Sequence, residues 1–227
     1  MLSIHQGHTP SLPPADVRVV IDVIRAFTTT HVALGNGALC VLLAGELDEA
    51  RRLAAAAPGR ILAGERNAIA PPDFDLGNSP AAVAKTDLEG RELVLTTSHG
   101  VQAVVHAAHD GPLVVTGFSN AGATLRYLKE RLDGGAQSIQ LIASHPESDD
   151  DMACAQWIRA RLQGHSEPTD EDVIERICQC SSAQKFLTPK PPSYVAEDLD
   201  YCARRQDAPW AMVVTANEES LVVERNQ

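Results

Sequence analysis

Chemically useful side chains recur in this sequence at the points where apolar, strand-like runs end. Asp22 closes the run at residues 17–21, and Arg25 follows three residues later. The run at residues 92–96 is followed at once by a polar segment, Thr97, Ser98, His99 and Gly100. The residues after a strand often open a helix, whose free N–H groups attract anions. Carboxylates beside such groups can hold Mg²⁺, so the pattern indicates a site for phosphoryl chemistry.

Two further junctions and one long loop add candidate residues. Asn120 stands in the junction at residues 119–122, and Asp151 ends an acidic run at residues 149–151. Residues 64–80 are rich in Pro, Asp, Asn and Gly and have no hydrophobic period. Loops of this length inside a domain are usually functional. The loop supplies Glu65, Arg66, Asp75, Asn78 and Ser79.

Structural roles compete with these functional ones. Ser, Thr, Asn and Asp are the usual N-caps of helices, so a single junction is more often a cap than a ligand site. Asp22 and Arg25 could form a structural ion pair, because a buried carboxylate needs a partner. His99 could be exposed at a helix start, and residues 149–151 could be a solvated first turn, or one of them could turn inward. Four junctions together with the loop favour a true pocket.

Several familiar phosphate-handling classes are excluded by spacing. The sequence has no G-x-x-x-x-G-K-S/T loop of the P-loop enzymes, no R-H-G of the histidine phosphatases and no C-x5-R of the cysteine phosphatases. Ile24 stands where haloacid-dehalogenase phosphatases need a second Asp after the nucleophile. Since no activated Ser or Cys is evident, the expected nucleophile is a water molecule bound to the metal.

The elements that must position these residues alternate along the chain. Strands are predicted at residues 17–21, 39–44, 60–63, 92–96, 113–116, 137–143 and 210–215, with helices at 26–33, 46–57, 98–108, 119–132, 149–162, 171–178 and 193–205. Strand–helix alternation predicts a layered α/β/α fold with a mostly parallel sheet. No linker marks a boundary, so residues 1–227 are expected to form one α/β unit, although a bilobal arrangement stays open.

The acidic composition limits the partners. Lys and Arg number 19 against 30 Asp and Glu, a net charge of −11. Such a surface repels phosphate backbones and anionic lipids, so we expect a small-molecule phosphoester and neither nucleic acid nor membrane as the partner. The start of the chain does not resemble a signal peptide and no long apolar run occurs, which predicts a cytoplasmic location. Homo-oligomerisation is left open.

Six segments match a known pattern: VVIDVIRAFTTT at residues 19–30, GER at 64–66, FDLGNSP at 74–80, LTTSHG at 95–100, GFSNA at 117–121 and DDMACA at 150–155. Together they resemble the motifs of the 2-phosphosulfolactate phosphatases, the ComB-like family. The resemblance spans most of residues 17–215. It implies a Mg²⁺-dependent phosphatase of α/β fold that releases phosphate from 2-phospho-3-sulfolactate.

The resemblance also implies roles for the candidates. We expect Mg²⁺ on Asp22, Glu65 and Asp75. Arg25 and Arg66 would neutralise the phosphoryl oxygens, His99 would protonate the leaving alkoxide, and Asp151 would join the catalytic group. The remaining substrate contacts are expected from Asn78, Ser79, Thr97, Ser98, Gly100 and Asn120.

Two departures from the family pattern bear on specificity. His99 stands where Asn is usual, and Gln102 where Arg is usual. The missing guanidinium predicts weak binding of a second anionic group, improved by Gln102→Arg. The same departures leave an alternative open, a non-catalytic binding protein for a phosphorylated or carboxylated metabolite.

Overall fold

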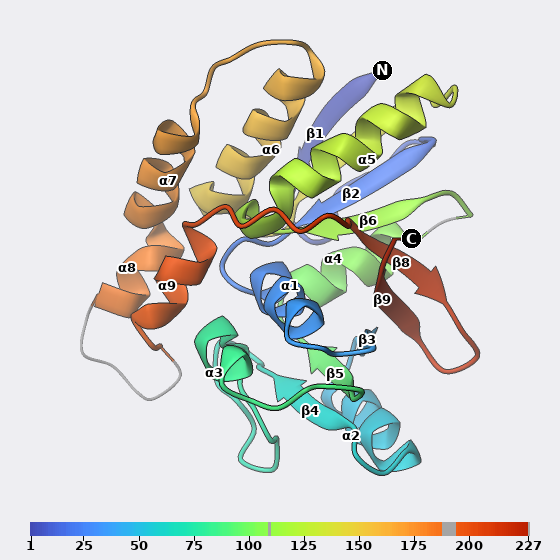
Figure 1. The fold of residues 1–227 in the computed structure, drawn as a ribbon, viewed down its shortest axis with the longest axis vertical. Helices are drawn as coiled ribbons and strands as arrows, with labels where there is room; N and C mark the ends of the chain where they lie inside the picture. Colours follow the sequence, from blue (N-terminus) through green and yellow to red (C-terminus); the bar gives the residue numbers. More distant parts are fainter. Residues whose placement is uncertain (109, 188–193, 227) are drawn as a thin grey trace.

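The computed structural model describes residues 1–108, 110–187 and 194–226, and these form a layered α/β/α fold around one nine-stranded sheet (Figure 1). The strands are β1 Leu2–Gln6, β2 Val17–Ile21, β3 Cys40–Leu43, β4 Ile61–Gly64, β5 Glu92–Thr96, β6 Leu113–Thr116, β7 Ile139–Ala143, β8 Met212–Ala216 and β9 Leu221–Arg225. The helices within these residues are α1 Ala26–Gly35, α2 Leu47–Ala56, α3 Pro80–Ala84, α4 Gly100–Ala107, α5 Ala121–Asp133, α6 Asp149–Leu162, α7 Asp170–Gln179, α8 Ser181–Leu187 and α9 Glu197–Cys202.

The sheet consists of two parallel blocks joined by an antiparallel hairpin. Its strand order is β1-β7-β2-β6-β8-β9-β3-β5-β4. The pairs β1–β7, β7–β2, β2–β6, β3–β5 and β5–β4 are parallel, whereas β6–β8, β8–β9 and β9–β3 are antiparallel. The predicted α/β class and the mostly parallel sheet are therefore confirmed.

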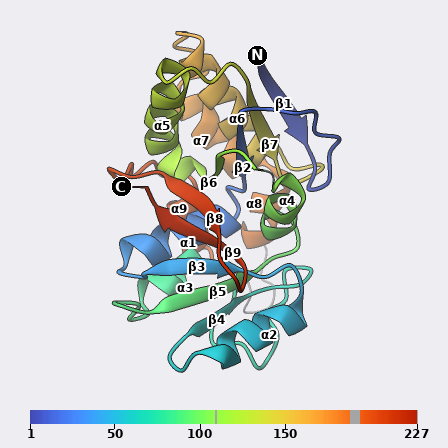
Figure 2. The ribbon, with the colours of Figure 1, turned by 90° about the vertical axis from the view of Figure 1, so that its right-hand side faces the viewer.

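The interior strand β2 is buried along its whole length, which explains why all of its residues except Arg18 are apolar. Val17, Val19 and Ile21 point into a core cluster with residues of α5, α6 and α7. Val20 joins a second cluster with residues of α1 and α4. Figure 2 shows α5 and α4 on opposite sides of β2 and β6. The strand is thus held rigidly by two helical layers, and so is the residue that follows it, Asp22.

Several elements differ from the sequence-based expectation. β1, β9, α3 and α8 were not predicted, and the last predicted strand is one arm of the β8–β9 hairpin. The helix expected over residues 193–205 is limited to α9, and residue 193 lies outside the described residues. By contrast, α6 spans residues 149–162 as predicted. None of the helices in the described part of the chain combines the length and apolarity that a membrane span requires.

Candidate active site

A cavity of about 280 Å³ opens where the parallel strands end. It is lined by residues that follow four strands, namely Ile24, Glu65, Ser98 and His145, and by the helix α8. Ile24 and His145 follow the neighbouring parallel strands β2 and β7, and Glu65 and Ser98 follow the neighbouring parallel strands β4 and β5. Each pair comes from the carboxyl ends of adjacent parallel strands. The two blocks run in opposite directions along the sheet, because three antiparallel pairings separate them, so only the tertiary structure brings the two pairs to one cavity. Several residues that the strand-end pattern in the sequence predicts therefore line this cavity.

A buried acidic group, formed by Asp22, Asp150 and Asp151, lies beside this cavity. Asp22 Oδ1 accepts a hydrogen bond from the Ala26 backbone N–H (2.9 Å), and its Oδ2 accepts one from Ser144 Oγ (3.3 Å). The same Ser144 hydroxyl lies 3.0 Å from Asp151 Oδ2. Asp22 is only 5% exposed and Asp150 and Asp151 only 1%. Two loops and the start of α6 thus hold three carboxyl groups close together.

Backbone donors fix the two carboxyl groups of α6. Asp151 Oδ1 accepts from the Val23 N–H at 2.7 Å, and Asp150 Oδ2 accepts from the Ile24 N–H at 3.1 Å. The third member of the acidic run, Asp149, instead pairs with Arg176. The run is therefore divided, because one member faces α7 and the other two clamp the segment after β2.

The acidic group carries a marked electrostatic strain. Burial, with the neighbouring charges of Asp150 and Glu65, raises the pKa of Asp22 to about 7. Burial also raises the pKa of Asp150, and burial with the charges of Asp150 and Asp22 raises that of Asp151. Among the described residues, no Lys, Arg or His forms an ion pair with any of the three. Without an opposite charge beside them, burial favours the protonated forms of these carboxyl groups.

This donor set fits Mg²⁺ in part. Mg²⁺ prefers oxygen ligands and is commonly held by one or two carboxylates, with waters and substrate phosphate completing its shell. Asp22 and Glu65 interact electrostatically and supply such carboxylates. In residues 1–108, 110–187 and 194–226, no three His, Cys, Asp or Glu side chains form a ready-made metal site. The chain accordingly fits a cation shared with a bound phosphoester.

Glu65 joins the loop after β4 to the junction after β5. Its Oε1 accepts from the Ser98 N–H (2.7 Å), and its Oε2 accepts from Ser98 Oγ (2.9 Å) and the Ala68 N–H (2.5 Å). Glu65 is 7% exposed and still lines the cavity. Each carboxylate oxygen has two lone-pair positions, so these contacts leave acceptor capacity for a further ligand.

Arg25 supplies a positive group of fixed orientation. Its Nη1 lies 2.6 Å from Asp198 Oδ2, and the two side chains are 6% and 0% exposed. The guanidinium stacks against Phe186 and Tyr194 at 5.0 and 5.8 Å from the ring centroids. Because Arg25, Phe186 and Tyr194 all line the cavity, the arrangement presents a guanidinium suited to a phosphate or carboxylate.

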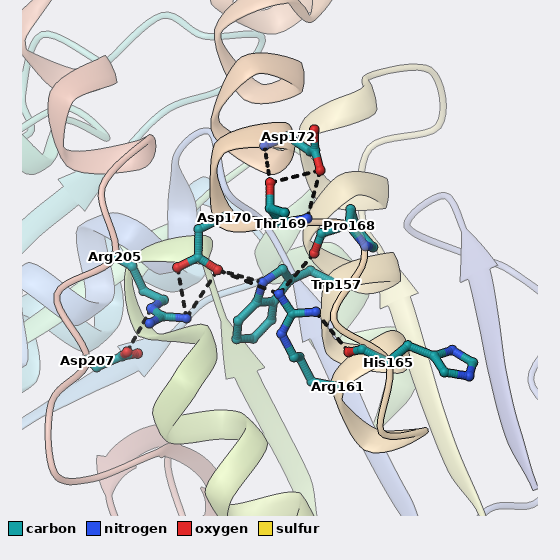
Figure 3. A network of polar contacts seen from close by, with 9 residues as sticks. All are labelled: Trp157, Arg161, His165, Pro168, Thr169, Asp170, Asp172, Arg205 and Asp207. Carbon is teal, nitrogen blue, oxygen red and sulfur yellow. Dashed lines mark hydrogen bonds and ion pairs between the residues drawn. The ribbon is translucent and has the colours of Figure 1, made fainter.

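The helix that carries Asp198 is followed by a firmly anchored segment (Figure 3). Arg205 pairs with Asp170 (3.0 Å) and Asp207 (2.9 Å), and its guanidinium lies over the Trp157 ring. The Trp157 indole N–H donates to Asp170 at 2.8 Å, and Arg161 lies over the same ring. These contacts tie the chain after α9 to α6 and α7.

The structure brings most of the predicted residues to the cavity or its immediate support. Arg25, Glu65, Asn78, Ser98 and His99 line the cavity. The others act behind the lining: Asp22 and Asp151 form the acidic group, Ser79 Oγ donates to Asp198, Thr97 Oγ1 accepts from the Val101 N–H, and Gly100 packs against Asp22.

Three predicted residues do not come together with this group. Asp75 is exposed, and its Oδ2 accepts from the Leu62 N–H along the edge strand β4. Arg66 donates to backbone oxygens and to Thr96 Oγ1. Asn120 is buried against the segment before β8. Gln102 stands where an Arg was expected to bind a second anionic group of the substrate. It donates to the Gly45 carbonyl and is not part of the cavity lining.

Sequence reasoning missed His145, Lys185 and Asp198. His145 directly follows Ser144 at the end of β7, so the strand-end signal applied to it as well. Lys185 lies on α8, which has no clear period, and Asp198 lies on the short helix α9. Nothing in their local sequence connects these two with residues 22–25, from which they are separated by more than half of the chain.

Comparison with known proteins shows the family to which the chain belongs. A model of the 2-phosphosulpholactate phosphatase family matches residues 3–217. A probable 2-phosphosulfolactate phosphatase of Bacillus subtilis is 40% identical over 99% of this chain and 98% of its own length. Proteins of the same name from Synechocystis and Thermoplasma acidophilum are 32% and 29% identical, over 89% and 84% of this chain and 92% and 82% of their own lengths. The chain therefore belongs to the 2-phosphosulfolactate phosphatase family.

Proposed function

We propose that this protein is a Mg²⁺-dependent phosphatase that hydrolyses a small anionic phosphoester of the 2-phosphosulfolactate type. The observation that carries the proposal is the buried acidic group beside a cavity that also presents the Arg25 guanidinium. Carboxylates that require a cation and a fixed guanidinium are the two features needed to bind a phosphoryl group. Family membership supports the same reaction class.

The roles follow from the contacts. Asp22 and Glu65 would hold Mg²⁺, which when bound stabilises the negative charge of the phosphoryl oxygens. Arg25, which lines the cavity, would bind those oxygens through its guanidinium. Asp150 and Asp151 act indirectly, because they hold the backbone of residues 23–24 and, through Ser144, orient Asp22.

His99 is a half-buried histidine of the cavity. Burial lowers its pKa, and nearby His8 and Lys185 lower it further. The neutral ring therefore predominates at pH 7, and protonation of the leaving alkoxide by His99 should be most effective below neutral pH. A cytoplasmic location and a small-molecule partner complete the proposal, which is compatible with the absence of a membrane-spanning helix in the described residues.

Phosphate release by the purified full chain tests the proposal. The substrates are 2-phosphosulfolactate, 2-phospholactate and p-nitrophenyl phosphate, each with Mg²⁺ and with a chelator. We expect turnover that needs Mg²⁺, that is lost in Asp22→Asn and that persists in Asp149→Asn. Asp149 is the matched control because it belongs to the same acidic run but pairs with Arg176. Full turnover by Asp22→Asn would contradict the metal placement, and binding without turnover would favour the non-catalytic binder.

A further inference from the structure

We infer that His145 binds an oxygen of the substrate's phosphate through its Nε2–H, as a hydrogen-bond donor whose tautomer is set by the protein. The inference rests on the proposed phosphatase function and adds a residue to its site. His145 follows β7, lines the cavity and is half-buried.

The loop after β7 determines which ring nitrogen carries the proton. His145 Nδ1 accepts hydrogen bonds from the backbone N–H groups of Glu147 (3.1 Å) and Ser148 (2.9 Å). A nitrogen that accepts two N–H groups has no proton of its own, so the neutral ring carries its proton on Nε2. Among the described residues, no group of the protein accepts a hydrogen bond from Nε2. The donor is therefore available to a ligand in the cavity.

The surroundings of the His145 ring disfavour protonation of Nδ1. Such protonation would place an N–H against two N–H donors. His99 from the start of α4, which contacts the ring, together with Lys185 from α8 and His8 from the segment after β1, also acts electrostatically against a positive charge on the ring. Burial and these three groups lower the pKa of His145 to about 4. The ring stays neutral in the range where phosphoesters are dianions. A neutral imidazole can still polarise an oxygen as a donor.

The backbone of His145 ties it to the acidic group. Its N–H donates to Asp151 Oδ2 at 2.9 Å, and the preceding Ser144 Oγ lies 3.3 Å from Asp22 Oδ2. The ring also lies 4.6 Å, centroid to centroid, from His99. A phosphate bound between Arg25 and the proposed Mg²⁺ ligands, Asp22 and Glu65, would therefore lie in the cavity that His145 also lines.

Two variants isolate the Nε2 donor from the structural role of Nδ1. Both His145→Gln and His145→Leu remove the Nδ1 acceptor, but the Gln amide nitrogen takes about the position of Nε2 and can donate. We expect kcat/KM for the phosphoester to fall about 10- to 100-fold in His145→Leu, as for a lost bond to a charged group, and several-fold less in His145→Gln. Equal losses in the two variants would overturn the inference.

A spectroscopic measurement does not depend on turnover. In ¹⁵N-labelled full-length protein, the His145 ring should show the Nε2–H tautomer from pH 5.5 to 8, and inorganic phosphate with Mg²⁺ should shift the Nε2 and Hε2 resonances. An Nδ1–H tautomer, or no shift of these resonances at saturating phosphate, would overturn the inference. If the wild type hydrolyses none of the phosphoesters but phosphate still shifts Nε2, the proposed reaction fails while the binding role of His145 stands.

Discussion

Replacing Asp198 by Asn should destabilise the protein and misplace Arg25 in a single step. Asp198 Oδ2 accepts from Arg25 Nη1 at 2.6 Å, and its Oδ1 accepts from Ser79 Oγ (2.6 Å) and the Ala81 N–H (3.1 Å). Asn keeps an acceptor for Ser79 and Ala81 but turns an N–H₂ group toward the guanidinium. The charge of Arg25 then loses this carboxylate in a site where it is 6% exposed.

The burial of this ion pair sets the size of the effect. Removing one member of a buried ion pair lowers the free energy of unfolding by about 3–5 kcal/mol. In a chain of this length, each kcal/mol lowers the midpoint of thermal unfolding by about 2–4 °C, so the midpoint should fall by about 6–20 °C. Misplacement of Arg25 should also lower kcat/KM by about 10- to 100-fold at temperatures where the variant is fully folded.

The neighbouring residue provides a matched control. Glu197, also on α9, pairs with Lys85 at 2.7 Å, but the two side chains are 44% and 66% exposed. Exposed ion pairs contribute little to stability, so Glu197→Gln should leave both the unfolding midpoint and kcat/KM unchanged. Urea and thermal unfolding, followed by circular dichroism, measure stability, and phosphate release measures activity. The reasoning would be refuted if Asp198→Asn unfolded at the same midpoint as the wild type, or if Asp198→Asn and Glu197→Gln lost equal amounts of stability and activity.

Three further predictions follow from the site. Between about pH 4 and 7 the folded state keeps a proton on Asp22 that the unfolded chain has lost, so the free energy of unfolding falls as the pH rises through this window. Without metal, Asp22→Asn should therefore exceed the wild type in free energy of unfolding by up to about 4 kcal/mol at pH 8 and by much less at pH 4. Urea titrations at the two pH values measure this difference, and equal values would contradict the prediction. Gly100→Ala would place a Cβ 2.4 Å from Asp22 Oδ2 and 2.8 Å from Ala26 Cβ, so it should lower the free energy of unfolding by about 1–3 kcal/mol and remove most phosphate release. Gly45→Ala is the control and should be tolerated, because the atom nearest to its new Cβ would be 3.6 Å away. Gln102→Arg should leave the ratio of kcat/KM for 2-phosphosulfolactate and 2-phospholactate unchanged, because Gln102 donates to the Gly45 carbonyl and lies outside the cavity lining; a rise in that ratio would restore Gln102 as the contact for a second anion.

The sequence by itself determined seven of the nine strands in the described part of the chain, together with the strand-to-helix junctions that supply most of the candidate residues. The apolar run of β2 has to be buried on both faces, and a carboxylate directly after it needs a partner or a cation. These are local consequences of composition and spacing, and they predict that Asp22, Ser98 and His99 lie between a strand and the helix that follows it, as in the structure. The loop after β4 was likewise evident, because it lacks any period and is rich in turn residues.

Tertiary structure alone decided which polar side chains meet. Arg25 and Asp198 are 173 residues apart and pair only because the fold brings α9 to the residue that precedes α1. The helical period of α6 likewise does not tell which of its three leading carboxylates face inward. Asp75 satisfies the same loop pattern as Glu65, yet it caps the edge of β4 while Glu65 turns to the junction after β5. The β8–β9 hairpin enters the middle of a parallel sheet by pairing with strands far away in the chain. Such contacts depend on how elements pack and not on the residues next to them in the sequence, because hydrogen bonds and ion pairs form between whichever groups packing brings together.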